Sequence, residues 1–139
     1  NWNKSIYYNE FLKFMPEIEE LNPNDYNLAL NGSKIALIFL SKLNNDTYTR
    51  RCFEIPCAKS LIISEHSSDM KNNIFPNNSC IYFNSNDDLL NKVSYYLKNH
   101  NERKLLANSA YNIIKNKHSI VNRVETINDT ILNILNTKT

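Results

Sequence analysis

Continuous apolar runs alternate with helical patterns along the chain. The run over residues 34–40 is rich in branched side chains and has the length of a strand that is covered on both faces. Residues 61–63 predict a second buried strand, and residues 79–84 predict a third strand. Short apolar strands that alternate with helices predict an α/β domain with a mainly parallel sheet flanked by helices.

Apolar residues that recur every three or four positions predict the helices. Helices are expected over residues 5–15, 25–31, 48–58, 87–100, 101–117 and 120–136. Asn24 and Asn86 are suitable N-caps, and a short strand is expected over residues 17–21. In the last helix, alternating steps of four and three residues predict a stripe that belongs to the core, formed by Ile120, Val124, Ile127, Ile131 and Ile134.

Length and charge limit the classes of protein. The chain has 139 residues, enough for a single domain over residues 1–139 but not for two. It begins with Asn1 rather than Met, so we expect it to be a fragment of a larger protein. Its 16 basic and 14 acidic residues give a formal net charge of +2, too little to indicate a nucleic-acid partner. No apolar run reaches 18 residues, so we expect no transmembrane segment.

The cysteines and histidines do not predict a metal site. Cys52, Cys57 and Cys80 are odd in number and form no C-x-x-C pair, which predicts free thiols in a reducing cytoplasm. The three histidines do not cluster with them in the sequence. We therefore expect no bound metal ion.

Polar residues concentrate in the segment that follows the first predicted strand. Asp46 lies in the loop after residues 34–40, and Arg50, Arg51 and Glu54 lie on the next predicted helix. Parallel sheets bind ligands at the carboxyl ends of their strands, where this segment is expected. Carboxylates accept hydrogen bonds from ribose hydroxyls, whereas arginine and a helix N-terminus bind phosphate. The combination is typical of a site for a nucleoside diphosphate.

A structural role would also account for the same residues. Asp46 is suitable as a helix cap, because aspartate is common at that position. Glu54 follows Arg50 by four residues and Arg51 by three, so it can form a salt bridge with either.

Several motifs resemble those of CgeB-type (spore maturation protein) glycosyltransferases. D-x-x-T-R over residues 46–50, R-x-F-E-I-P over residues 51–56, an apolar strand and then Ser64-Glu65 follow the order of that family. The later part, IYFNSNDDLLNKVSYYLKNHNERKLLANSAYNIIKNKHSIVNRVE, is similar to its D/E-L-L helix, its Y-L-x5-R step and its closing H-(S/T)-x3-R. The resemblance covers roughly residues 16–130.

The resemblance implies a fold and an activity. Such proteins are GT-B glycosyltransferases with two Rossmann-like domains, of which the C-terminal one binds the nucleotide-sugar donor. This chain looks like that C-terminal domain without its first strand or strands. The N-terminal acceptor domain would belong to the same complete chain, and part of the last helix would pack on it.

The resemblance also implies roles for individual residues. Glu54 matches the second glutamate of the E-x7-E motif, which holds the donor ribose, and Asp46 matches the first acidic residue, near the transferred sugar. Arg51 would lie near the diphosphate or brace Glu54. The remaining phosphate-binding candidates belong to the helix start, namely Thr47, Thr49 and Arg50.

The chain departs from the family pattern at two positions. The first acidic residue is Asp46 rather than glutamate, so its reach is one methylene shorter. The family pattern P-A-x-G has no glycine here, since the chain reads Pro56-Cys57-Ala58-Lys59. Lys59 is a candidate to contact phosphate or to obstruct it.

The donor is expected to be a UDP- or GDP-sugar, and the reaction to need no metal ion or other cofactor, because the sequence has no suitable D-x-D motif. We expect a bacterial enzyme of surface-glycan synthesis, in the cytoplasm or at the inner face of the membrane. The isolated fragment is expected to be inactive.

Two other interpretations remain open at this point. One is a non-catalytic α/β interaction module in which Asp46, Arg50, Arg51 and Glu54 form a salt-bridged structural knot. A cavity beside Asp46 and Glu54 would favour the enzyme, whereas pairing of Glu54 with both arginines and no cavity would favour the module. The other is a phosphoacceptor receiver domain, which requires an acidic cluster at several strand ends that the sequence lacks.

Overall fold

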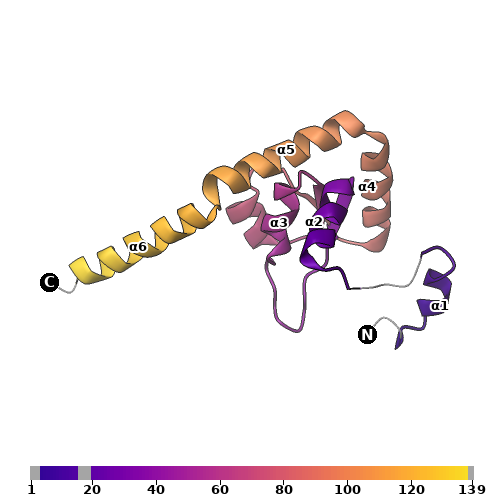
Figure 1. Cartoon of the computed structure of the whole chain (residues 1–139), viewed down its shortest axis with the longest axis horizontal. Helices are drawn as coiled ribbons and strands as arrows, with labels where there is room; N and C mark the ends of the chain where they lie inside the picture. The colour runs from indigo at the N-terminus through magenta and orange to yellow at the C-terminus, as the bar shows by residue number, and fades with distance from the viewer. Residues whose placement is uncertain (1–3, 16–19, 138–139) are drawn as a thin grey trace.

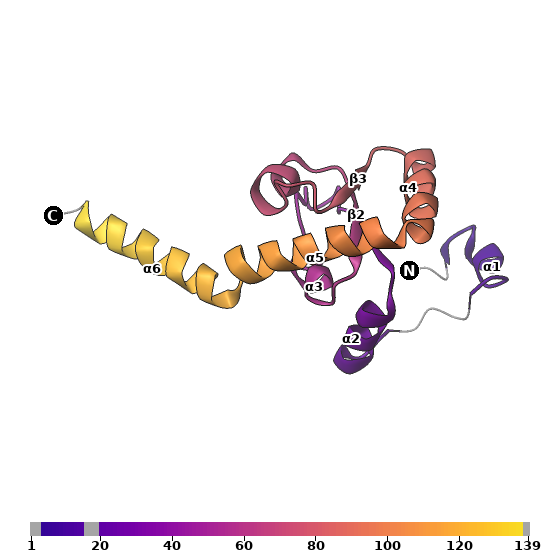
Figure 2. The ribbon, with the colours of Figure 1, turned by 90° about the horizontal axis from the view of Figure 1, so that it is seen from above.

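A parallel sheet forms the centre of the protein. The computed structural model describes residues 4–15 and 20–137. Three strands, β1 (Ile35–Ile38), β2 (Leu61–Glu65) and β3 (Ile81–Phe83), are hydrogen-bonded in the order β1-β2-β3, and both pairings are parallel. Helices flank this sheet and form the C-terminal part of the chain (Figures 1 and 2). The prediction of an α/β, Rossmann-like fold with a helical C-terminus is confirmed.

The helices agree closely with the sequence pattern after residue 22. The helical elements are α1 (Tyr8–Phe11), α2 (Pro23–Gly32), α3 (Arg51–Cys57), the π-helical turn η2 (Met70–Ile74), α4 (Asn86–Lys98), α5 (His100–Lys117) and α6 (Ile120–Asn136). The caps differ by one or two residues from those predicted. Asn22 accepts the backbone N–H groups of Asn24 and Asp25, and Ser85 accepts that of Asp88.

The two faces of β2 belong to two parts of the core. Ile62 packs in a buried cluster with side chains from α3, η2 and α5, whereas Leu61 and Ile63 pack with Phe83 and Tyr96 beneath α4. Leu61, Ile62 and Ile63 of β2 are all 0% exposed. Because successive strand side chains point to opposite faces, the continuous apolar run over residues 61–63 fits a strand that is covered on both sides.

Two N-terminal predictions differ from the structure. The helix expected over residues 5–15 is reduced to the four residues of α1, which has no buried side chain. Too little apolar surface is buried there to offset the entropy of ordering a longer helix. The strand expected over 17–21 falls largely on residues 16–19, which lie outside the described part of the chain, and residues 20 and 21 belong to no strand.

The run over residues 34–40 is only partly buried, contrary to the expectation of two covered faces. β1 is an edge strand of the described sheet, and of its four residues only Ile38 is buried. Leu37 is 40% exposed and Phe39, just beyond the strand, is 56% exposed. An edge strand lacks a neighbour on one side, so its apolar side chains are covered less than those of β2.

The apolar stripe of α6 is exposed, which corrects its assignment to the core. Its exposed fractions range from 51% to 84%, over Ile120, Val124, Ile127, Ile131 and Ile134. The helix extends away from the body in both views (Figures 1 and 2). The periodicity predicted the helix and its apolar face correctly, but no described residue buries that face.

The corner between α5 and α6 sets the direction of α6. Ser119 and Asn122 form a capping box at its start. Arg123 donates to Nδ1 of His118 at 3.1 Å, and its guanidinium lies 5.5 Å from the centre of the Phe53 ring. Burial, with the charges of Arg123 and Lys117, lowers the pKa of His118. His118 and Arg123 thus join the corner before the last helix to α3 through Phe53.

We expect thiol reagents to distinguish the three free cysteines. Cys57 is exposed, whereas Cys52 and Cys80 are buried. Burial raises the pKa of Cys52, and it raises that of Cys80 to about 12, so little reactive thiolate forms at pH 8. Titration with a chromogenic disulfide at pH 8 should label one thiol rapidly in the folded chain and all three in denaturant. Rapid labelling of Cys57→Ser would contradict this packing.

Candidate functional site

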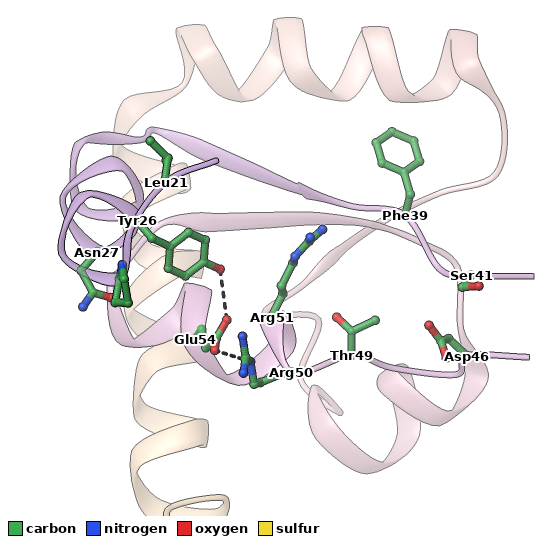
Figure 3. Close-up of a pocket in the computed structure, with 11 residues that line it drawn as sticks. Leu21, Tyr26, Asn27, Phe39, Ser41, Asp46, Thr49, Arg50, Arg51 and Glu54 are labelled. Carbon is green, nitrogen blue, oxygen red and sulfur yellow. Dashed lines mark hydrogen bonds and ion pairs between the residues drawn. The ribbon is translucent and has the colours of Figure 1, made fainter. Parts of the chain in front are cut away.

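A cavity of about 730 Å³ opens beside the end of β1 and the start of α3 (Figure 3). Its walls come from α2, the β1–α3 loop and α3. Five predicted site residues line it, namely Asp46, Thr49, Arg50, Arg51 and Glu54. The carboxyl end of a parallel strand and the next helix therefore bring most of the predicted polar cluster to one cavity.

The β1–α3 loop returns Asp46 to the end of the strand. The backbone N–H of Asp46 donates to the carbonyl of Ser41 at 3.0 Å, and Asn45 adopts a left-handed conformation with φ 52°. Asparagine tolerates this conformation better than most residues. The half-buried Asp46 carboxylate forms no hydrogen bond or ion pair with another described residue, and the N-cap of α3 is Arg50. Asp46 is therefore not the helix cap that the structural interpretation assigns to it.

Both carboxylate oxygens of Glu54 have protein partners. The hydroxyl of Tyr26 donates to one oxygen at 3.0 Å, and Nε of Arg50 lies 2.7 Å from the other. Burial and the Glu54 carboxylate raise the pKa of Tyr26. The Arg50 side chain is 87% exposed, so its ion pair is a weakly stabilising surface pair.

Arg51 differs from its neighbour Arg50. In the described part of the chain its guanidinium forms no salt bridge, and Figure 3 shows it extending away from Glu54 toward the side of the cavity that holds Phe39. The sequence left open which arginine pairs with Glu54, and the structure pairs it with Arg50. Arg51 is therefore the one of these two arginines that has no carboxylate partner among the described residues.

The start of α3 offers fewer backbone donors than the sequence suggests. The N–H groups of residues 52, 53 and 54 donate to the carbonyls of Thr49 and Arg50, and the Thr49 N–H lies 3.4 Å from the Cys52 sulfur. In the described chain, the amides of Arg50 and Arg51 are left for an anion. Thr49 also lines the cavity, but its hydroxyl oxygen is buried and interacts with the Cys52 side chain.

Two predicted site residues lie away from this cavity. The hydroxyl of Thr47 donates to Asp69 at 2.8 Å and its carbonyl accepts from Ser67, so Thr47 holds the loop against the segment that precedes η2. Lys59 lies just before β2, at the opposite end of the sheet, with its ammonium 4.8 Å from the centre of the Tyr111 ring. The structure does not bring either residue to the cavity.

The backbone conformation of Lys59 also explains why the family pattern has a glycine at this position. It follows the end of α3 with φ 55°, in the left-handed conformation that glycine adopts most easily after a helix. The P-A-x-G glycine is therefore accounted for by the helix end, and its absence here does not alter the cavity.

Sequence reasoning missed the cavity residues that come from other elements. Tyr26 reaches Glu54 from α2, 28 residues earlier, and Phe39 and Ser41 follow β1. The apolar run that ends at residue 40 was a signal for the strand end, but Tyr26 carried no comparable signal. Within the described residues, no three His, Cys, Asp or Glu side chains lie close enough to share a metal ion.

No helix in the described ranges is both long and apolar enough to cross a membrane.

Comparison with known proteins supplies the family. No curated protein and no solved structure gives a significant match to the chain. The model of a family described as glycosyl transferase-like matches residues 2–129, which is nearly the whole chain. The chain therefore belongs to the glycosyl transferase-like family, and its role is in glycosyl transfer.

Proposed function

We propose that the chain is the donor-binding domain of a CgeB-like glycosyltransferase of the GT-B type. The substrate is a nucleoside diphosphate sugar, UDP- or GDP-linked, and the sugar passes to an acceptor in bacterial surface-glycan synthesis without a metal ion. One observation carries the proposal: the cavity beside β1 gathers two carboxylates, three hydroxyl-bearing side chains and two guanidinium groups in a chain of this family. An acceptor domain outside residues 1–139 completes the enzyme, in the cytoplasm or at the inner face of the membrane.

In this proposal Glu54 binds the ribose. Each carboxylate oxygen has two lone pairs, so the bonds from Tyr26 and Arg50 leave acceptor capacity for hydroxyl groups. The Tyr26 hydroxyl also fixes the position of the carboxylate before a ligand arrives. Glu54 is therefore oriented to accept hydrogen bonds inside the cavity.

Arg51 and Thr49 contribute the contacts to the diphosphate. A guanidinium group matches two phosphate oxygens at once, and Arg51 has no competing carboxylate among the described residues. The amides of Arg50 and Arg51 lie at the start of the same helix, and Thr49 precedes them in the cavity wall. Asp46, nearer the end of the sheet, contacts the transferred sugar in this arrangement.

The interaction module has less support than the donor site. A structural knot requires Glu54 to pair with both arginines and leaves no cavity. Among the described residues, Glu54 forms one ion pair, to Arg50, and lines a cavity of about 730 Å³. A volume in this range is typical of sites for small molecules.

Titration with nucleotides tests the proposal. We expect UDP or GDP to cause saturable NMR shifts over residues 46–54, with ADP and CMP as comparisons. Glu54→Ala should weaken that binding at least about tenfold, the equivalent of about 1.4 kcal/mol. Glu125→Ala removes an exposed carboxylate of α6 and should leave the binding unchanged. If the complete protein binds no nucleotide at millimolar concentration, or Glu54→Ala binds normally, the proposal is wrong.

A further inference from the structure

A second cavity, of about 570 Å³, lies over the carboxyl ends of all three strands. Glu65 ends β2, Phe83 ends β3, and the loop after β1 contributes Ser41 and Asp46. Ser41 and Asp46 also line the first cavity, so the two cavities adjoin at these residues. A ligand in the first cavity therefore has a direct continuation into the second.

Glu65 is held in a fixed position in this second cavity. The backbone N–H of Leu40 donates to one of its carboxylate oxygens at 2.7 Å, which joins the segment after β1 to the end of β2. The other oxygen forms no hydrogen bond or ion pair with a described residue, and the side chain is half-buried. A charge-assisted bond of this length holds the carboxylate in place and leaves acceptor capacity facing the cavity.

The chemistry of the lining favours a ligand rich in hydroxyl groups. Asp46 and Glu65 are acceptors, Asn84 offers a donor and an acceptor, and Ser41 offers a hydroxyl. A phosphate is disfavoured, because the two carboxylates repel it and the basic residues of the lining, Lys42 and His66, are both exposed. A base is disfavoured too, since the Phe83 ring is 5% exposed and packs against Phe39. The described residues also hold no group of three ligands for a metal ion.

We propose that this second cavity binds a glycosyl unit, with Glu65 and Asn84 as its specificity-determining contacts. The inference rests on the proposed function and extends it, because it divides the substrate between two adjoining sites. The first cavity takes the nucleoside diphosphate, and Asp46 stands at the junction where the sugar is attached. The sugar of the donor is the expected occupant, and an acceptor sugar has the same chemistry.

Binding measurements on the full-length protein distinguish the two cavities. Glu65→Gln removes the charge but keeps an oxygen that accepts from Leu40, so the loop is preserved. Asn84→Trp fills the second cavity, and Asn91→Trp, on the exposed surface of α4, is its control. We expect Glu65→Gln and Asn84→Trp to weaken the binding of UDP-glucose or GDP-mannose at least about tenfold. The same variants should weaken the binding of UDP or GDP less than about threefold. Asn91→Trp should change neither.

Free monosaccharides identify the source of the sugar. Suppose that the two variants spare the nucleotide sugars but abolish the NMR shifts that glucose, galactose or N-acetylglucosamine cause at His66, which lines the second cavity. The cavity then holds an acceptor sugar, and the proposal stands. Equal losses for UDP and UDP-glucose, or no change for any sugar, would overturn it. Failure of the proposed function is recognised separately, because the unsubstituted protein would then bind no UDP or GDP, while the monosaccharides still report on the second cavity.

Discussion

Arg51→Ala is expected to weaken the binding of UDP or GDP by about 10- to 100-fold. Hydrogen bonds to charged groups contribute about 1.5–3 kcal/mol, which corresponds to that range of affinity. The guanidinium of Arg51 lines the first cavity and has no carboxylate partner among the described residues, so a diphosphate would be its main partner. Isothermal titration at low and at physiological salt would measure the loss, which should shrink as salt screens the charges.

Arg50→Ala is the matched control for this substitution. The two arginines are adjacent, but Arg50 is 87% exposed and already paired with Glu54. Because exposed ion pairs contribute little, Arg50→Ala should change the affinity less than about fivefold. Arg51→Ala should not change the binding of the nucleoside alone, uridine or guanosine. Equal losses from both variants, or an equal loss for the nucleoside, would show that Arg51 does not contact the diphosphate.

The sequence was enough to place most polar residues of the first cavity at one strand end, because these residues are close together in the chain. Asp46, Arg50, Arg51 and Glu54 fall within one loop and one helix, so the position of β1 alone was enough to place them at a strand end. Tyr26 and Glu65 reach the two cavities from other elements. Their positions depend on how α2 and β2 pack, which hydrophobic spacing does not encode.

The spacing of apolar residues along the chain also predicts which face of an element is apolar, but it does not predict what covers that face. The steps of four and three residues in α6 define a real helix, yet its stripe is exposed, because the corner at Ser119 directs the helix away from the sheet. The apolar run of residues 34–40 similarly predicted β1 but not its place at the edge of the described sheet. Burial follows from neighbours, and neighbours are a property of the tertiary structure.

Ile62→Ala is expected to lower the free energy of unfolding by about 2–5 kcal/mol. Ile62 is 0% exposed and packs in the cluster formed by α3, η2 and α5, so its truncation leaves a cavity that close-packed neighbours fill poorly. Such a loss is a large part of the roughly 5–15 kcal/mol that stabilises a typical domain. Urea denaturation followed by circular dichroism would measure it, with an unchanged slope if unfolding stays two-state.

Leu37→Ala provides the comparison on the edge strand. Leu37 pairs in register with Ile63 and is likewise a branched aliphatic residue, but 40% of its surface remains exposed. Less apolar area is lost from the folded state, so the expected cost is about 1 kcal/mol. The difference between the two variants measures how far β2, rather than β1, forms the centre of the core. Equal costs would mean that the outer face of β1 is covered in the folded protein, which would contradict its exposure here.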